Sequence, residues 1–263
     1  MCERPDTKRS TMNLISSHVR NRKSILRRSH FILGIAKTVR GLGTDICVIV
    51  WLARREAKIA EYLKAHSVRK LQLAASNNLL PGWLNTDIFL NHRSLVYLDA
   101  TRRFPFDDDT FDYILSEHMI EHLAYETAQF MLRECLRVLK PGGRVRVATP
   151  DLRVILALHG HEKTKLQNNY IEWAIARFMP EVKEYKEVHL INNFFRAWGH
   201  QFLYDKETLY HALSAAGFDE IEFYKPGASA DPNLQQIESH GKELNSEDIN
   251  QFETIAIEGR KQR

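Results

Sequence analysis

Short apolar runs alternate with helical patterns from Lys70 to the end of the chain. Runs that are typical of buried strands occur at residues 70–74, 84–88, 95–99, 112–116 and 144–148. Two more, IEFY and ETIAIEG, follow nearer the C-terminus. Strands that alternate with helices predict a parallel sheet with helices on both faces. We therefore expect an α/β fold for this part of the chain.

Two helices between these strands have clear ends. The segment YETAQFMLRECLRVLKPGG places its apolar residues on one stripe at helical spacing, and KPGG is expected to end the helix. The segment YDKETLYHALSAAGF has Asp205 as its expected N-cap and Gly217 as its expected stop. Residues 152–204 precede it and contain many large rings. We expect this insertion to lie over the ligand site as a substrate cap, with core packing as the alternative role for any single ring.

The first 69 residues have a different pattern. Residues 7–44 contain nine Lys or Arg and no acidic residue, and residues 1–43 are expected to form a flexible, solvated arm. Attachment of this arm to an anionic membrane surface and cleavage as a targeting segment are the alternatives. Residues 44–69 predict a helical extension, whose apolar first half packs on the main domain, residues 70–263, or on a membrane or partner surface.

The composition narrows the class of protein. With 263 residues, 44% hydrophobic and 27% charged, the chain predicts one main globular domain. Its longest apolar run, Ile46 to Ala53, has eight residues, whereas a membrane-spanning helix needs about 20. Three cysteines without metal-type spacing indicate a reducing compartment, so we expect a cytoplasmic protein. A net charge of +4 gives no reason to expect specific nucleic-acid binding, and the oligomeric state is left open.

Chemically useful residues stand directly after the predicted strands. In such a sheet, ligands bind beyond the carboxyl ends of the strands. The loop at residues 74–78, AASNN, has only small side chains at a place where backbone could approach a ligand closely. Asp87 ends the second strand and could accept both hydroxyls of a ribose. Asp99 ends the third, where it could bind an adenine amino group beside the backbone N–H of Ala100.

Four segments carry a resemblance to a known family: LQLAASNNLLPGWLNTDI, YLDATRRFPFDDDTFDYILSEHMIEHL, RECLRVLKPGGRVRVATPDL and GHQFLYDKETLYHALSAAGF. Together they resemble the class I S-adenosylmethionine-dependent methyltransferases, and more narrowly small methyltransferases of glycan and cell-surface biosynthesis. The resemblance runs from about Lys70 to Glu258 and implies a Rossmann-like, seven-stranded sheet. It implies S-adenosylmethionine as the cofactor and a small-molecule or glycan acceptor. The cofactor residues that it implies are Ala74, Ser76, Asn78, Asp87, Asp99 and Ala100.

The first loop departs from that family at two positions. The family reads G-x-G there, whereas this chain has Ala74 and Ser76. Glycine serves at such positions because a Cβ can clash with a close ligand or with an unusual φ/ψ value. A strained position costs on the order of 1–3 kcal/mol, so we expect weaker cofactor binding. Restoring both glycines is expected to tighten binding and to lower the melting temperature slightly through added backbone entropy.

The reaction that the resemblance implies is an in-line displacement, in which an acceptor atom attacks the sulfonium methyl group. His118 follows the fourth strand and is the first candidate for a general base, because imidazole has a pKa of about 6.5. A helix-start histidine that binds a loop is its alternative role. Glu117 is expected to contact the cofactor, or to be a solvated surface carboxylate. Asp151 follows the fifth strand and is either a catalytic group or a helix N-cap.

Two other functions fit parts of the sequence. His118-Met-Ile-Glu121-His122 matches the H-x-x-E-H pattern of zinc peptidases, in which two histidines on one helix face bind the metal. No third ligand follows at a fixed spacing, so the sequence assigns no metal ligands. The second alternative is a non-catalytic protein of the same fold, which binds a partner through the basic arm and the apolar helix.

Overall fold

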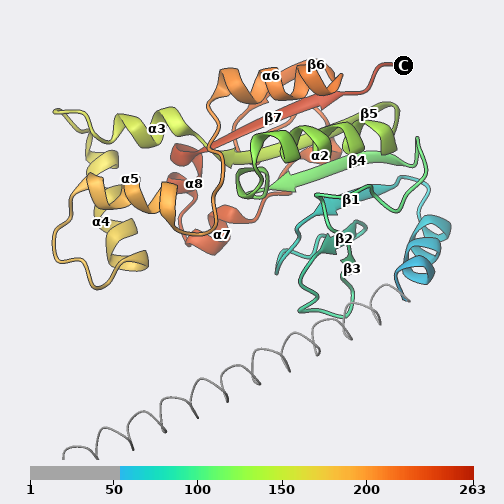
Figure 1. Cartoon of the computed structure of the whole chain (residues 1–263), viewed down its shortest axis with the longest axis horizontal. Coiled ribbons are helices and arrows are strands. Elements are labelled where there is room, and N and C mark those ends of the chain that lie inside the picture. The colour runs from blue at the N-terminus through green and yellow to red at the C-terminus, as the bar shows by residue number, and fades with distance from the viewer. Residues whose placement is uncertain (1–53) are drawn as a thin grey trace, which may run out of the picture. The chain divides into compact units, whose positions relative to one another are not determined.

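The strands form where the sequence predicts them. The computed structural model describes residues 54–263. Its strands are β1 (Lys70–Leu73), β2 (Leu84–Asp87), β3 (Val96–Tyr97), β4 (Phe111–Glu117), β5 (Leu139–Pro150), β6 (Asp219–Tyr224) and β7 (Thr254–Arg260). They form a seven-stranded sheet in the order β3-β2-β1-β4-β5-β7-β6 (Figure 1). The predicted seven-stranded α/β fold is therefore confirmed.

The direction of the strands differs from the prediction at one place. Strands β1 to β5 pair parallel with one another, so their carboxyl ends meet at one edge. Strand β7 runs antiparallel to both of its neighbours, β5 and β6. The predicted parallel pairing thus holds from β1 to β5, whereas β7 is antiparallel because β6 and β7 are consecutive strands that lie side by side in the sheet.

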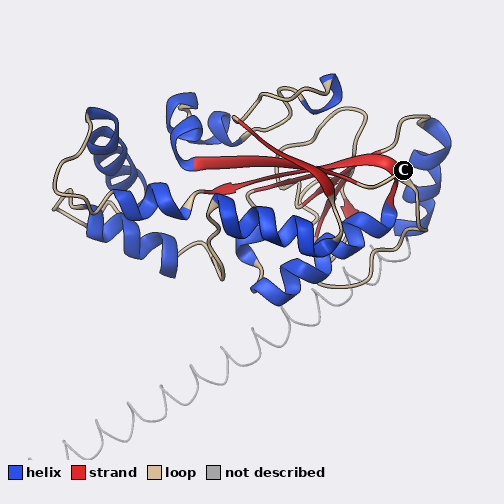
Figure 2. Cartoon of the chain, turned by 90° about the horizontal axis from the view of Figure 1, so that it is seen from above, coloured by secondary structure: helices blue, strands red, loops and turns tan. Residues whose placement is uncertain are grey.

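Helices cover the sheet and extend beyond it. They are α2 (Tyr125–Val138), α3 (Leu152–Ala157), α4 (Lys165–Phe178), α5 (Glu187–Arg196), α6 (Lys206–Ala216), α7 (His240–Leu244) and α8 (Glu247–Glu253), with the short 3₁₀ turns η1 (Ile120–His122) and η2 (Pro232–Leu234). Helices α2 and α6 pack side by side, and Figure 2 shows helices on both sides of the sheet. The apolar stripe of α2 accounts for its position, because Ala128, Met131, Leu132 and Cys135 are all buried.

The predicted helix ends are mostly correct. Asp205 caps α6 by accepting a hydrogen bond from the backbone N–H of Thr208, and Gly217 ends it in the left-handed region with φ +102°. Helix α2 ends at Val138 instead of at KPGG, because Leu139 already adopts an extended conformation and begins β5.

Two connections build the region beside the carboxyl ends of the strands. Residues 152–204 contain α3, α4 and α5, which lie beyond one end of the sheet in Figure 1 and share a separate hydrophobic cluster with α7 and α8. Residues 225–253, which we call the β6–β7 segment, contain η2, α7 and α8. Leu234 and Ile237 of this segment pack against Leu115 of β4. The sequence analysis did not predict this second connection.

Only part of the N-terminal region for which we made predictions lies within the described residues. Residues 54–65 are helical, and Ile59 and Tyr62 are buried in the main core. The predicted arm at residues 1–43 and the first part of the predicted extension, residues 44–53, lie outside the described residues. Within residues 54–263 no helix combines the length and hydropathy that a membrane span requires.

Candidate functional site

A cavity of about 510 Å³ lies at the carboxyl ends of β1, β2 and β4, and we call it the strand-end cavity. All seven residues predicted to contact the cofactor line it: Ala74, Ser76, Asn78, Asp87, Asp99, Ala100 and Glu117. His118 lines it too, together with Ser239 and Glu243 from the β6–β7 segment. The structure thus brings the predicted residues together, while their role toward a cofactor stays a prediction.

The loop after β1 adopts a left-handed backbone conformation at the two positions where this chain lacks glycine. Ala74 and Ser76 have φ values of +49° and +48°, in the left-handed region that glycine enters most readily. The loop is held by two hydrogen bonds. The backbone N–H of Ala75 donates to the carbonyl of Thr86 (2.9 Å), and that of Ser76 donates to Oδ2 of Asp87 (2.9 Å). These hydrogen bonds hold two non-glycine residues in a strained backbone conformation.

Asp87 is buried at the end of β2 with capacity to accept more hydrogen bonds. Its Oδ2 receives the Ser76 amide, and its Oδ1 receives the backbone N–H of Phe89 (2.7 Å). A carboxylate oxygen can accept about two hydrogen bonds, so each oxygen retains one acceptor position. Asp87 can therefore fix the loop and still accept a pair of hydroxyl groups from a ligand in the cavity.

Asp99 has more local partners than Asp87. Its Oδ1 accepts hydrogen bonds from the backbone N–H (3.0 Å) and the hydroxyl (2.6 Å) of Thr101. Its Oδ2 lies 3.1 Å from Nε of Arg102, whose side chain is 82% exposed. An exposed pair of this kind contributes little stability, so Oδ2 is the oxygen more open to a ligand.

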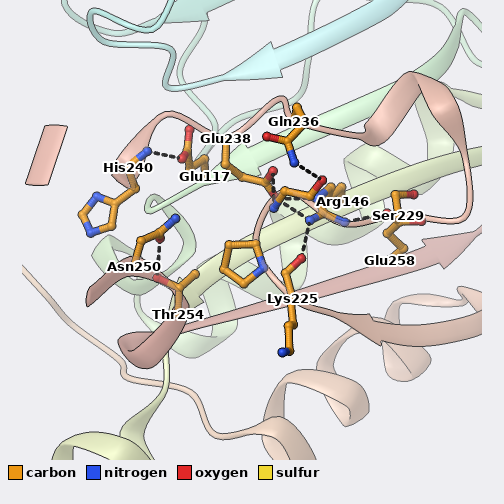
Figure 3. A network of polar contacts seen from close by, with 12 residues as sticks. Glu117, Arg146, Lys225, Ser229, Gln236, Glu238, His240, Asn250, Thr254 and Glu258 are labelled. Carbon is orange, nitrogen blue, oxygen red and sulfur yellow. Dashed lines mark hydrogen bonds and ion pairs between the residues drawn. The ribbon is translucent and has the colours of Figure 1, made fainter. Parts of the chain in front are cut away.

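Glu117 joins the sheet to the β6–β7 segment instead of being a solvated surface carboxylate. Its Oε1 accepts a hydrogen bond from the backbone N–H of His240 (2.7 Å; Figure 3). It accepts another from the backbone N–H of Ser239 (2.7 Å). Its Oε2 accepts one from Nδ2 of Asn78 (3.2 Å). Burial raises the pKa of Glu117, and these hydrogen bonds offset that rise only in part. The carboxyl thus closes one wall of the strand-end cavity.

His118 is held on both sides of its ring. It follows β4 with a φ of +44°, its Nδ1 lies 3.4 Å from Oε1 of Glu121, and its Nε2 lies 3.3 Å from the hydroxyl of Thr254. Burial acts to lower the pKa of His118, but the adjoining Glu121 carboxylate and other nearby carboxylates raise it above its ordinary value. Both nitrogens are engaged, which matches the structural role that the sequence left open for His118 better than that of a base.

Asp151 is a helix cap. Its carboxylate accepts a hydrogen bond from the backbone N–H of Arg153 (2.9 Å) at the start of α3, and its own backbone pairs with Tyr204. It does not line either of the two cavities described here. Of its two predicted roles, the structure gives it the N-cap, because its side chain turns toward the first turn of the helix.

A second cavity, of about 330 Å³, lies between the sheet edge and the inserted helices, and we call it the ring cavity. Its walls include five aromatic rings besides histidines: Tyr170, Trp173, Phe178, Phe194 and Trp198. Trp198 meets Phe178 and Phe194 edge to face, with ring centroids 5.1 and 5.3 Å apart. The two cavities share His118, His122 and Glu243, so a ligand in one lies beside a ligand in the other.

His240 has the arrangement of a general base in the ring cavity. Its ring stacks on His118 with centroids 3.6 Å apart, and its Nε2 hydrogen-bonds Oε1 of Glu253 (2.9 Å). The other oxygen of Glu253 accepts a hydrogen bond from the hydroxyl of Tyr170. Among residues 54–263, Nδ1 of His240 has no hydrogen-bond partner. A carboxylate on one ring nitrogen therefore leaves the other able to take a proton.

Arg146 anchors the segment that carries His240. This fully buried residue of β5 lies 2.5 Å from a carboxylate oxygen of Glu238 and 2.6 Å from one of Glu258 (Figure 3). It also donates a hydrogen bond to the carbonyl of Lys225, where the β6–β7 segment begins. The segment is thus tied to the sheet at its start and next to His240.

The H-x-x-E-H pattern does not form a peptidase site. That site requires both histidines on one face of a helix. Here His118 has a left-handed backbone and stacks on His240, whereas His122 ends the three-residue turn η1 and meets the ring of His200. The two histidines therefore have different neighbours.

Sequence reasoning missed His240 and Glu253 because neither follows a parallel strand. The available signal was weak: Ser246-Glu-Asp-Ile249 reads as a helix N-cap, and the structure shows Ser246 capping α8. Such a cap predicts a helix, but it does not predict what that helix faces.

Sequence comparisons align part of the chain with methyltransferases. Residues 58–147 match the sequence model of the family described as "Methyltransferase domain". A relative from Clavibacter sepedonicus, named demethylmenaquinone methyltransferase, is 32% identical over 130 residues, which are 48% of this chain and 47% of that protein. The chain thus spans about half the length of this curated relative.

Solved structures align over most of the chain at low identity. A SAM-dependent methyltransferase from Archaeoglobus fulgidus aligns with a TM-score of 0.45 and 15% identity, covering 81% of this chain and 93% of that one. Phosphoethanolamine N-methyltransferase 2 from Haemonchus contortus, in complex with S-adenosyl-L-methionine, aligns with a TM-score of 0.39 and 15% identity, covering 79% and 53%.

The family match falls on the part of the chain that builds the strand-end cavity. Residues 58–147 include β1 to β4 and the lining residues from Gln72 to Leu123. Residues 58–147, which supply most of the lining of this cavity, are thus similar to the methyltransferase-domain family, in line with the resemblance of the sequence.

Proposed function

We propose that the chain transfers the methyl group of S-adenosylmethionine to a small-molecule acceptor bound in the ring cavity. The observation that carries this proposal is the contact between the two cavities. The predicted cofactor residues line one, rings line the other, and His118, His122 and Glu243 belong to both. A reaction between two ligands requires their reacting atoms to be held next to each other.

The strand-end cavity fits the cofactor of this family. Its volume of about 510 Å³ is within the range of small-molecule sites, about 300–1,000 Å³. Asp87 keeps acceptor positions for the ribose hydroxyls, and Asp99 with the Ala100 amide would hold the adenine. The loop from Ala74 to Asn78 would hold the methionine part. When bound, S-adenosylmethionine supplies an electrophilic methyl group.

The ring cavity suits a small acceptor with an apolar or flat face. Its edge-to-face rings offer apolar walls, while Arg177 and Glu243 supply charges of both signs. The name of the Clavibacter relative, demethylmenaquinone methyltransferase, supports a small-molecule acceptor. A sugar or glycan acceptor would use the same walls, since sugar rings pack on aromatic faces.

His240 is the residue we assign to proton removal from the acceptor. Glu253 fixes the ring through Nε2 and would stabilise the charged imidazolium once Nδ1 has taken a proton. We expect His240→Gln to lower the rate of methyl transfer by roughly 10²–10⁴-fold without changing S-adenosylhomocysteine affinity. His161→Gln, at an exposed loop position, is the control. An equal loss in both variants would remove this role from His240.

The direct test of the proposed function is calorimetric titration of the full chain with S-adenosylhomocysteine. We expect saturable binding at one site. Tritiated S-adenosylmethionine is then incubated with the protein and panels of quinones, phenols and sugars, and labelled products are separated and counted. Absence of cofactor binding by folded protein would overturn the proposal.

A further inference from the structure

Glu121, His122 and His200 converge beside the ring cavity, which all three line. One potential ligand atom from each lies within 4.8 Å of the others. We propose that these three side chains bind one divalent transition-metal ion. The sequence assigned no metal ligands, because His200 stands far from the H-x-x-E-H pattern along the chain.

The backbone holds the two parts of this site together. The backbone N–H of Gln201 donates to the carbonyl of Glu121 (2.8 Å), and that of Phe202 donates to the same carbonyl (3.2 Å). The side-chain amide of Gln201 donates to the carbonyl of His122 (2.7 Å). Three hydrogen bonds thus fix the residues beside His200 against the turn that carries the other two ligands.

Glu121 is a buried carboxylate that its neighbours orient. Its residue is 1% exposed, its Oε2 accepts a hydrogen bond from the hydroxyl of Thr149 (2.9 Å), and Nδ1 of His118 lies 3.4 Å from its Oε1. Burying a carboxylate is costly unless a cation or several donors compensate for the lost water. Oriented carboxylates of this kind, with hydrogen bonds from a second layer of residues, are a common feature of metal sites.

His200 is fixed with one ring nitrogen available. Its Nδ1 lies 2.9 Å from the carbonyl of Phe194, to which it can only donate, so the proton is on Nδ1 and Nε2 carries the lone pair. Metal-binding histidines are commonly held in this way, with the second ring nitrogen donating to a backbone carbonyl.

His122 supplies the second imidazole. Its ring lies edge to face with that of His200, with centroids 5.0 Å apart. Within residues 54–263, no hydrogen bond from its ring nitrogens is formed. Its ring can therefore turn to a metal without breaking a hydrogen bond.

The donor set selects the class of metal. Two imidazoles and one carboxylate suit Zn²⁺, Fe²⁺, Co²⁺ or Ni²⁺, whereas Mg²⁺ and Ca²⁺ prefer oxygen ligands. Three protein ligands also leave coordination positions open, as in catalytic rather than structural sites. Because all three residues line the ring cavity, the open positions would face an acceptor oxygen or nitrogen; this last step alone rests on the proposed function.

The test uses untagged, full-length protein from which metals have been removed with EDTA. It is titrated with Co²⁺, whose visible absorption reports ligand geometry, and the stoichiometry is checked by calorimetry with Zn²⁺. We expect one ion per chain. His122→Ala and His200→Ala should each weaken binding by at least ~100-fold, since loss of a second-layer partner alone costs about 10–100-fold. His211→Ala, at an exposed position on α6, should bind as the wild type does.

Each outcome decides the proposal. Wild-type protein that binds no Co²⁺ or Zn²⁺ stoichiometrically overturns it, and so does binding that survives in both His122→Ala and His200→Ala. Circular dichroism of each variant verifies its fold. Cofactor binding without metal binding would overturn the metal site alone, whereas metal binding without cofactor binding would support it and overturn the proposed function.

Discussion

The two cavities that meet at His118, His122 and Glu243 are built from different parts of the chain. The strand-end cavity is formed mainly by residues that directly follow β1, β2 and β4, together with backbone amides of the first loop. The ring cavity is formed by side chains of α4 and α5 and by the β6–β7 segment. The sheet itself therefore forms the strand-end cavity, whereas two long connections add the ring cavity to the sheet.

This difference separates two roles within one protein. A loop fixed to strand ends holds its ligand through backbone and carboxylate groups, which suits a ligand common to a whole family. A wall of side chains on inserted helices can change without altering the sheet, which suits a ligand specific to one member. Residues that attach the insertions to the sheet should therefore affect stability most, and residues of the first loop should affect cofactor affinity.

The largest expected effect is on stability, at the attachment of the β6–β7 segment. Arg146→Ala leaves Glu238 and Glu258 buried without their cation, and breaking a buried pair in this way costs roughly 3–5 kcal/mol. Urea unfolding monitored by circular dichroism measures the loss. The matched control is Arg144→Ala on the same strand. The partner of Arg144 is Glu220, which is half exposed and whose carboxylate oxygen lies 3.6 Å from the guanidinium.

A surface pair such as that of Arg144 contributes less than about 1 kcal/mol, so the two arginine variants should differ clearly. Equal losses in free energy of unfolding would show that the β6–β7 segment does not depend on Arg146.

The second prediction concerns the cofactor. Asp87→Ala removes the acceptor for the ribose hydroxyls and for the Ser76 amide, a change of roughly 1.5–3 kcal/mol. Affinity for S-adenosylhomocysteine should fall about tenfold to a hundredfold, measured by calorimetry. Asp99→Ala should have a smaller effect, because the Ala100 amide remains. Asp107→Ala, at an exposed position, serves as the control, and a similar affinity for all three variants would exclude Asp87 from the site.

The third prediction revises the expectation for the first loop. Because Ala74 and Ser76 both have positive φ, replacing both by Gly relieves strain of about 1–2 kcal/mol per residue against an entropy cost of about 0.5–1 kcal/mol per residue. The melting temperature should therefore rise, not fall. Ala75→Gly, whose φ is not positive, should lower it. A lower melting temperature for the double variant would mean that the loop is not strained in solution.

The smallest effect is expected at Asp231, in the first part of the β6–β7 segment. Burial alone would raise the pKa of Asp231, but hydrogen bonds from the Asn233 backbone and the Tyr113 hydroxyl outweigh it and lower the pKa. A lowered folded-state pKa contributes stability above the unfolded value, about 3.8, and that stability is lost as the pH falls through the folded-state pKa.

Asp231→Asn should therefore lose about 0.5–1 kcal/mol at pH 7, and the difference from wild type should shrink below about pH 4. Urea unfolding across this range measures it. A difference that stays constant with pH would show that the charge of Asp231 is not the source of its contribution.

The sequence predicted the position of side chains correctly where they follow a strand end, while their role toward a cofactor stays a prediction. Asp87, Asp99 and Glu117 were identifiable because each terminates or directly follows a short apolar run, and parallel strands bring such residues to one edge. It failed for His240, Glu253 and Arg146. Their neighbours are set by the β6–β7 segment, whose polar sequence has no run or period that fixes where it packs.

His118 shows a different limit. Its place after β4 was predicted, but whether its ring is free depends on Glu121, Thr254 and the stacked ring of His240. Those contacts join distant parts of the chain, and no local spacing encodes them. Position along a strand predicted where this side chain lies, and only tertiary packing decided which ring nitrogens remain available.

The hydrogen bond between the Ser76 amide and Asp87 also bears on how this loop can change over evolution. An aspartate that holds the loop from outside makes glycine dispensable at positions 74 and 76, so substitutions there can accumulate while the aspartate remains. Loss of Asp87 would instead release a loop that has no glycine to favour its backbone conformation. A search that demands glycine in this loop will therefore pass over such lineages, whereas one that asks for the aspartate at the end of the second strand will find them.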